Sequence, residues 1–70
     1  MAEKSPPLDT YELFNVGNCY QEKHKDEKAL QYYDAAIKAN PDAYFVERHK
    51  GILLYNLGRY QEALDSLKKV

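Results

Sequence analysis

Apolar residues recur along this chain in four stretches, each with the three- and four-residue spacing of an amphipathic helix. The predicted helices run from about residue 10 to 23, from the polar break at 23–26 to about 39, from about 43 to 57, and from the glycine at 58 to the end of the chain. The inward stripes are Leu13, Val16, Gly17 and Tyr20, then Ala29, Leu30, Tyr33, Ala36 and Ile37, and in the last helix Tyr60, Ala63, Leu64, Leu67 and Val70. The pattern predicts an all-α fold.

Capping and turn residues mark the ends of these helices. Asp9 followed three residues later by Glu12 has the spacing of a capping box, so the first helix is expected to begin directly after Asp9. Asp26 and Asp42 are expected to accept hydrogen bonds from the free amides at the starts of the second and third helices. Gly58 adopts the left-handed conformation readily and is expected to close the third helix.

The second half of the chain repeats the first at an offset of 34 residues. Gly17 matches Gly51, and the residues around the two glycines correspond at the same offset. The other matched pairs are Pro7 and Pro41, Ala29 and Ala63, Leu30 and Leu64, Tyr33 and Leu67, and Ala36 and Val70. The sequence therefore predicts two copies of the same helical hairpin. The small residues are expected to let the two helices of each hairpin approach closely.

Glycine, alanine and large apolar residues at these positions of a 34-residue period resemble the tetratricopeptide repeat family. The resemblance implies tandem antiparallel helix-turn-helix hairpins, as in a fragment of an α-solenoid. On this basis residues 9–70 form one helical domain, with a first repeat over about 10–43 and a truncated second repeat over about 44–70 that lacks a capping helix. Residues 1–8 are expected to be a flexible lead-in.

Two departures from the family pattern change the expected packing. His24 and Asp26 replace the usual glycine and aromatic residue in the first turn, so this turn is expected to be less tightly tied. Glu47 and Lys50 replace the apolar pair at the matching positions of the first helix, and their spacing allows an exposed ion pair worth roughly a few tenths of a kcal/mol. We therefore expect a thinner contact between the repeats around them.

In members of this family the first helix of each hairpin lines a concave groove, so the resemblance places a binding surface opposite the core stripes of the first and third helices. The residues expected there are Tyr11, Phe14, Asn18, Gln21, Phe45, Arg48, His49, Ile52 and Tyr55. Aromatic and arginine side chains on a face that the core does not need are typical anchors for a peptide or a partner helix. The sequence therefore predicts a protein-interaction scaffold.

Two alternatives for this surface remain open. Phe14, Ile52 and Tyr55 are also able to pack on one another across adjacent helices, which would make the surface structural. Some family members hold the C-terminal carboxylate of a heat-shock chaperone, and Asn18 matches one residue of that clamp. Phe14 and His49 replace two others, and the third repeat of the clamp is not in the sequence. A more apolar or mixed peptide is the expected ligand.

The fourth helix indicates a function of a different class. Each repeat of a solenoid offers an apolar face to the next, so the last one needs a polar cap. No cap follows the last helix in the sequence, and its open apolar surface is expected to consist of Tyr60, Leu64, Leu67 and Val70. The alternative function is therefore a self-assembling oligomerisation module, formed by end-to-end stacking or by helix exchange.

Composition narrows the remaining classes. The net charge of −1, from 10 basic and 11 acidic side chains, gives no basic field that would attract nucleic acid. The sequence shows no signal-peptide core and no run long enough to span a membrane, so we expect no membrane partner. Cys19 is the only cysteine, which excludes an intramolecular disulfide and fits a reducing, cytoplasmic setting.

The sequence contains none of the usual arrangements of an active or metal site. His24 and His49 lie on different elements without a recognised metal-ligand spacing. Cys19 is interpreted as a small, partly buried filler and not as a catalytic thiol. There is no glycine-rich phosphate loop, nucleophile elbow or pair of catalytic acids. We therefore expect no catalysis, no metal and no cofactor.

Overall fold

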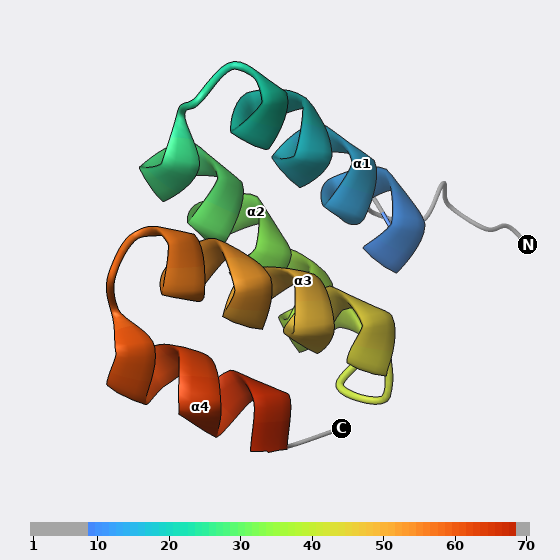
Figure 1. Cartoon of the computed structure of the whole chain (residues 1–70). Coiled ribbons are helices and arrows are strands. Elements are labelled where there is room, and N and C mark those ends of the chain that lie inside the picture. Colours follow the sequence, from blue (N-terminus) through green and yellow to red (C-terminus); the bar gives the residue numbers. More distant parts are fainter. Residues whose placement is uncertain (1–8, 69–70) are drawn as a thin grey trace, which may run out of the picture.

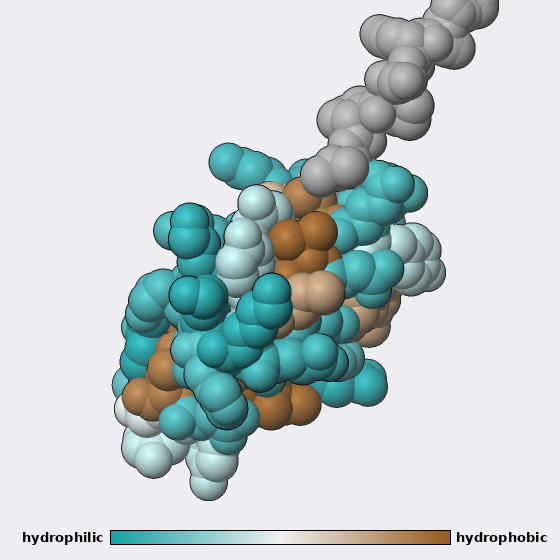
Figure 2. All heavy atoms as spheres, turned by 90° about the horizontal axis from the view of Figure 1, so that it is seen from above, coloured by the Kyte–Doolittle hydropathy of each residue, from teal (hydrophilic) through white to brown (hydrophobic). Residues whose placement is uncertain are grey.

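The computed structural model describes residues 9–68, which form four helices joined by short turns (Figure 1). The helices are α1 (Thr10–Glu22), α2 (Asp26–Ala39), α3 (Tyr44–Asn56) and α4 (Tyr60–Lys68). Successive helices run antiparallel, and the hairpins α1–α2 and α3–α4 lie one after the other (Figure 1). Seen from above, the molecule is mainly hydrophilic, with hydrophobic side chains in separate patches (Figure 2). The predicted all-α fold is confirmed; the predicted lead-in at 1–8 lies outside the described residues.

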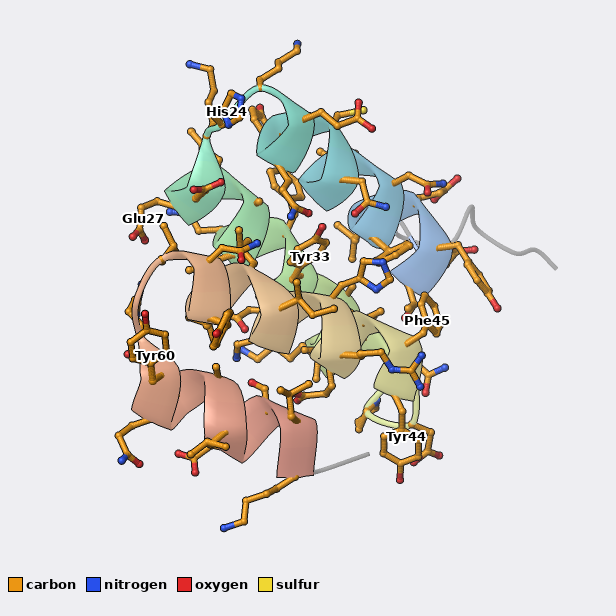
Figure 3. All side chains as sticks on the ribbon, in the orientation of Figure 1. His24, Glu27, Tyr33, Tyr44, Phe45 and Tyr60 are labelled. Atoms are coloured by element: carbon orange, nitrogen blue, oxygen red, sulfur yellow. The ribbon has the colours of Figure 1, made fainter. Side chains whose placement is uncertain are left out.

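The two hairpin turns are closed by the same backbone hydrogen bonds at an offset of 34 residues. The matched bonds are Lys25 N to Tyr20 O and Arg59 N to Leu54 O, both 2.9 Å, and His24 N to Gln21 O and Gly58 N to Tyr55 O, at 2.9 and 3.0 Å. His24, which lies in the first turn (Figure 3), has a φ of 63° where Gly58 has 83°. The prediction of a less tightly tied first turn is therefore wrong for its hydrogen bonding, because His24 adopts the left-handed conformation despite its Cβ.

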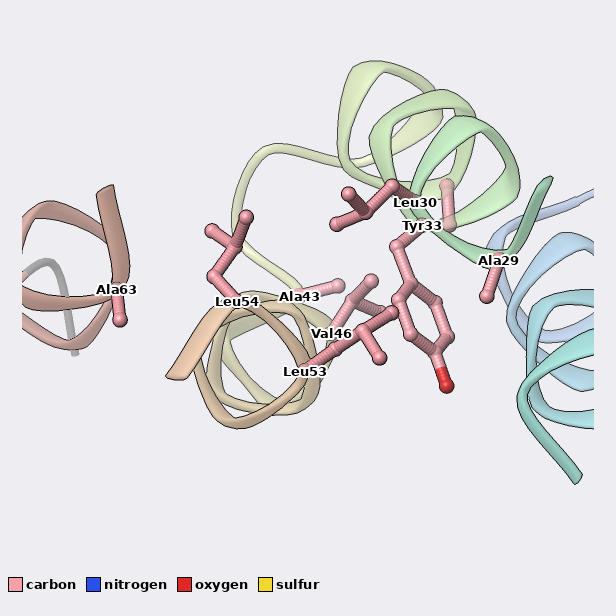
Figure 4. Close-up of a cluster of buried hydrophobic side chains, with 9 residues drawn as sticks. Ala29, Leu30, Tyr33, Ala43, Val46, Leu53, Leu54 and Ala63 are labelled. Atoms are coloured by element: carbon pink, nitrogen blue, oxygen red, sulfur yellow. The ribbon is translucent and has the colours of Figure 1, made fainter. Parts of the chain in front are cut away.

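The core lies mainly between α2 and α3 (Figure 4). Its buried apolar residues are Ala29, Leu30, Tyr33, Ala36, Ala43, Val46, Leu53, Leu54 and Ala63. The apolar side chains of α1 are only partly buried, and they pack on this core from one side. α2 and α3 are therefore the two inner helices of the described residues, since α2 packs against α1 and α3, and α3 packs against α2 and α4.

Gly17 and Gly51 allow the close approach that the sequence predicted. A Cβ on Gly17 would lie 2.7 Å from Cε1 of Tyr33, and a Cβ on Gly51 would lie 2.8 Å from Cγ of Leu67. Contacts that short do not occur between carbon atoms in folded proteins, so a larger residue at either position requires a neighbour to move. The two hairpins therefore share the same interior contact.

The capping predictions are partly right. The side chain of Asp9 accepts from the amide of Glu12 at 2.9 Å, and the side chain of Glu12 accepts from the amide of Asp9 at 3.1 Å, which confirms the capping box. Asp26 and Asp42 do not cap α2 and α3, whose N-cap residues are not held by a side-chain hydrogen bond. The reason is position, since Asp26 lies inside the first turn of α2 and Asp42 precedes the N-cap of α3.

The prediction of an exposed ion pair between Glu47 and Lys50 is wrong. Glu47 is only 4% exposed, and the ammonium of Lys50 lies 2.7 Å from the carboxylate of Asp34 on α2. Spacing along one helix shows neighbours on that helix alone, whereas Lys50 reaches across to the preceding hairpin. This pair adds to the contact between the repeats, which the sequence predicts to be thinner here.

Candidate protein-interaction surface

Four of the predicted groove residues form one aromatic cluster that joins α1 to α3. The ring of Phe14 meets Phe45 and His49 edge-on, with centroids 5.0 and 4.8 Å apart, and Tyr11 stacks on Phe45 at 5.3 Å. Edge-to-face and offset-stacked rings at such distances are favourable contacts beyond their buried area. We call Tyr11, Phe14, Phe45 and His49 the aromatic cluster. The packing alternative is thus right for Phe14, although its partners are not the predicted ones.

The orientation of His49 is fixed by its own helix. Its Nδ1 lies 2.9 Å from the carbonyl oxygen of Phe45, one turn earlier in α3. Because a carbonyl oxygen only accepts, Nδ1 is the donor in this contact. His49 is half-buried, and its ring is also near Tyr33, with centroids 6.4 Å apart. Its position is therefore set by α1, α2 and α3 together.

Asn18 and Gln21, also predicted groove residues, are tied to a buried tyrosine of α2. The hydroxyl of Tyr33 bonds to Oδ1 of Asn18, and it lies 2.8 Å from Oε1 of Gln21. A hydroxyl has one proton, so it donates to one amide oxygen at a time. Burial raises the pKa of Tyr33 above its usual 10.0, and the negative charge of Glu22 raises it further. This link was not predicted from the sequence, where its only signal is the polar tip of Tyr33 at an inward position.

The other predicted groove residues remain available for contact. Arg48, Ile52 and Tyr55 are exposed, and their spacing of four and three residues places them along one side of α3. We call these three residues the α3 stripe. Ile52 is 46% exposed, and the ring that lies beside Tyr55 is Tyr60. Together with Tyr11, which is exposed although it stacks on Phe45, the α3 stripe forms the accessible part of the predicted groove.

The predicted self-association surface is exposed on α4 as far as the structure describes it. Tyr60, Leu64 and Leu67 all keep substantial accessible area, while Val70 lies outside the described residues. Tyr60, at the start of α4 (Figure 3), lies beside Tyr55 with ring centroids 5.2 Å apart. The α3 stripe therefore continues onto α4, and two surfaces that the sequence analysis treated as separate adjoin each other.

A family model described as tetratricopeptide repeat matches residues 10–43, which span α1, α2 and the following turn. The chain belongs to the tetratricopeptide repeat family. The structure places a second hairpin of the same kind 34 residues later, with matched glycines and matched turn hydrogen bonds. Tetratricopeptide repeats generally serve as protein–protein interaction modules and as scaffolds without catalytic chemistry.

Two curated proteins are similar to this tetratricopeptide repeat chain. Superkiller protein 3 of Saccharomyces cerevisiae is 33% identical over 64 residues, which is 91% of this chain and 4% of that protein. UDP-N-acetylglucosamine--peptide N-acetylglucosaminyltransferase of Giardia intestinalis is 35% identical over 60 residues, which is 81% of this chain and 4% of that enzyme. The chain thus spans a small part of the length of the relatives it matches. No solved structure matches it significantly.

Some features of the tetratricopeptide hairpins lie away from the predicted surfaces. Cys19 is exposed, so its interpretation as a partly buried filler is wrong, because it lies on the side of α1 that turns away from α2. A shallow depression of about 380 Å³ is lined by Gln31, Asp34, Ala35, Ile37 and Lys38 of α2. A second, of about 180 Å³, is lined by Lys50, Leu54, Glu62, Asp65 and Ser66 of α3 and α4. Neither contains a predicted groove residue.

Two searches of the described residues concern other functions. Between residues 9 and 68, no three His, Cys, Asp or Glu side chains lie close enough together to hold a metal ion. None of the four described helices combines the length and the apolar character that crossing a membrane requires.

Proposed function

We propose that this chain is a non-catalytic interaction module that binds a peptide or a partner helix along α1 and α3. The observation that supports the proposal most strongly is that some predicted groove residues pack between the hairpins while others stay exposed. Phe14, Phe45 and His49 are used in joining the two hairpins, whereas Tyr11 and the α3 stripe beside them stay exposed. The proposal includes a reducing, cytoplasmic setting, since Cys19 is the only cysteine.

The geometry favours binding because the exposed anchors stand on ordered neighbours. Tyr11 stacks on Phe45, which itself meets the edge of Phe14. An aromatic anchor whose position is already fixed loses less side-chain entropy when a ligand covers it. Ile52 and Tyr55 add apolar area, and Arg48 adds a guanidinium that is able to bind a carboxylate.

The test starts from ligands selected on the full chain. Peptides enriched from a random display library would be synthesised and titrated against the chain and its variants by fluorescence anisotropy. Tyr11→Ala combined with Ile52→Ala should weaken binding about tenfold or more, since both side chains are exposed anchors. Lys28→Ala combined with Gln31→Ala, two exposed positions of α2, is the control and should leave the affinity unchanged.

Equal affinity of the Tyr11→Ala, Ile52→Ala variant for every selected peptide would contradict this function. Circular dichroism of each variant shows whether its helices are intact. A loss of affinity in the Lys28→Ala, Gln31→Ala control would indicate that the peptides bind on α2 instead.

Self-association is a second candidate, and the observation that favours it is the exposed apolar side of α4. Leu64 is 55% exposed although it lies on the same side of its helix as the buried Leu30 on α2. A second copy of the chain that covered this side would remove it from water. Light scattering over a dilution series tests this candidate, with Leu64→Asn as the variant that should abolish any dimer. A monomer at every concentration would exclude it.

A further inference from the structure

The contacts between α3 and the first hairpin show which kind of helix packs over a hairpin of this sequence. Besides stacking on Tyr11 through Phe45, α3 packs on Phe14, Leu30, Tyr33 and Asp34 of the first hairpin. Phe14 meets the rings of Phe45 and His49, Leu30 and Tyr33 pack around Val46 and Leu53 (Figure 4), and Asp34 pairs with Lys50. α3 therefore covers the aromatic ring of Phe14, the buried pair Leu30 and Tyr33, and the carboxylate of Asp34.

The counterparts of these four residues lie 34 positions later and are exposed. They are Arg48, Leu64, Leu67 and Lys68. Leu30 is 7% exposed and Tyr33 is fully buried, whereas Leu64 is 55% and Leu67 37% exposed. Since the turn geometry of the two hairpins is the same, the difference comes from the helix that covers the first hairpin. We call Arg48, Leu64, Leu67 and Lys68 the end face.

The charge of the end face differs from that of the surface under α3. Lys68 stands where the first hairpin has Asp34, and Arg48 stands where it has Phe14. Lys68 follows Leu64 by four residues, so it lies on the same side of α4. The acidic residues Glu62 and Asp65 line the depression toward α3 instead. A helix that takes the place of α3 here would meet two cations, which favours acidic residues at the facing positions.

A second copy of the chain, stacked head to tail, does not match this surface. Its α1 would take the place of α3, and Glu12 and Cys19 of α1 correspond to the buried Val46 and Leu53. Glu12 is also engaged in the capping box with Asp9. The matching positions of α1 thus supply neither of the two apolar contacts that α3 makes with the first hairpin.

We propose that the end face binds an acidic amphipathic helix of a partner protein. The contacts of α3 give the pattern, since Val46 and Leu53 are apolar positions seven residues apart and His49 and Lys50 lie between them. The partner helix has two apolar residues at this spacing, which cover Leu64 and Leu67, and acidic residues at the two central positions, which meet Arg48 and Lys68. This site goes beyond the proposed peptide surface, with which it shares only Arg48.

The probe is a labelled peptide with the sequence of residues 43–57 of this chain, carrying His49→Glu and Lys50→Glu. Its comparison peptide has the same sequence with His49→Lys and the native Lys50. Fluorescence anisotropy against the full chain should show saturable binding of the acidic peptide, about tenfold tighter than the basic peptide at low salt. The ratio should shrink as salt is added, because the facing charges are exposed.

Three variants of the full chain locate the binding site. Leu64→Asn should weaken the acidic peptide about tenfold, since it removes an apolar contact from an exposed position without unfolding α4. Lys68→Glu should weaken the acidic peptide and strengthen the basic one. Lys28→Glu, the same change of charge at an exposed position of α2, is the matched control and should alter neither.

Equal affinity for the acidic and the basic peptide, or full affinity of Leu64→Asn, would overturn the proposal. A dimer in light scattering that Leu64→Asn dissociates would assign the end face to a second copy instead. Tyr11→Ala lies outside the end face and should leave the acidic peptide bound. Because Tyr11 belongs to the proposed peptide surface and not to the end face, this variant shows which of the two surfaces binds the acidic peptide.

Discussion

The hairpins α1–α2 and α3–α4 have the same backbone, yet they meet different surroundings. In both, a glycine admits a large side chain from the second helix, and a left-handed residue closes the turn. The side chain over Gly17 is Tyr33, which is fully buried and has two amide oxygens as alternative acceptors for its hydroxyl, whereas the side chain over Gly51 is Leu67, which is 37% exposed. The same interior contact is therefore locked in the first hairpin and able to adjust in the second.

Position within the array, as well as sequence, therefore determines how rigid a repeat is. α3 covers the first hairpin from one side, and its Lys50 forms an ion pair with Asp34 of that hairpin. Among the described residues, no helix does the same for the second hairpin, whose apolar residues on α4 stay accessible. We expect equivalent substitutions to cost more in the first hairpin than in the second.

The largest contrast is expected for the two glycines. In Gly17→Ala the new Cβ would lie 2.7 and 2.8 Å from ring carbons of Tyr33 and 3.3 Å from the carbonyl oxygen of Ala29. The buried ring cannot move away, so overpacking should outweigh the gain in helix propensity and destabilise the chain by about 2 kcal/mol. In Gly51→Ala the nearest atoms are Cγ and Cδ2 of Leu67, at 2.8 and 2.9 Å, and we expect this 37% exposed side chain to change its χ1 rotamer more easily than the buried ring of Tyr33.

Urea denaturation followed by circular dichroism measures this contrast. Gly51→Ala should lie within about 0.5 kcal/mol of the native chain, because the better helix propensity of alanine offsets the small displacement. Equal losses in the two variants would show that the second hairpin is as rigid as the first, and the comparison would fail.

The next effect concerns the hydroxyl of Tyr33, whose counterpart in the second hairpin, Leu67, has none. Tyr33→Phe keeps the ring over Gly17 but removes the hydrogen bonds to Asn18 and Gln21. Both amides are half-buried and regain water in part, so the expected cost is about 1 kcal/mol in urea denaturation. Leu67→Ile, which keeps an aliphatic side chain at the matched position, is the control and should cost less.

Tyr33 also gives this contrast a pH dependence. Burial, and then the charge of Glu22, raises its pKa above 10.0, so the folded chain binds this proton more tightly than the unfolded chain does. Its contribution to stability is therefore complete below about pH 10 and is lost as the pH rises through the raised pKa. The gap between the native chain and Tyr33→Phe should narrow above about pH 10, and a constant gap would contradict the role of burial.

The sequence predicted the four helices from local spacing, and it predicted the glycine contacts from the 34-residue period. The 34-residue period and the stripes located α1 to α4 within a few residues of their observed ends. Some errors are local, such as the caps expected at Asp26 and Asp42, but others concern side chains that reach beyond their own helix. Lys50 pairs with Asp34 of α2, and the amide of Asn18 bonds to Tyr33. Spacing along one helix contains no information about such partners.

The sequence predicted which residues make up the candidate surface, but not which of them pack together and which stay exposed. All nine proposed groove residues lie on α1 and α3, yet only the structure separates the aromatic cluster from the α3 stripe. That separation depends on how α3 crosses α1, which a one-dimensional pattern does not define. The charge change from Asp34 to Lys68, by contrast, was visible in the sequence once the period was known.

A smaller contrast is expected in the turns, and here the first hairpin is the weaker one. His24 occupies the left-handed conformation at a steric cost that Gly58 avoids. His24→Gly should therefore stabilise the chain by about 0.5 kcal/mol, and Gly58→His should destabilise it by about 1 kcal/mol. Thermal denaturation of the two variants and of the double exchange measures these values. A loss of stability in His24→Gly would indicate that the imidazole makes a favourable contact of its own.

The smallest effect is expected for the ion pair at the junction of the hairpins. Asp34 is more than half exposed at its side chain, and Lys50 about a quarter, so their pair 2.7 Å apart should contribute about 0.5 kcal/mol. Asp34→Asn should lose this amount at low salt and much less at high salt, because mobile ions screen exposed charges. The double exchange Asp34→Lys with Lys50→Asp should recover it. If the exchange recovers nothing, Lys50 stabilises the junction through its apolar stem and not through its charge, and the contrast between Asp34 and Lys68 would then matter for partner choice alone.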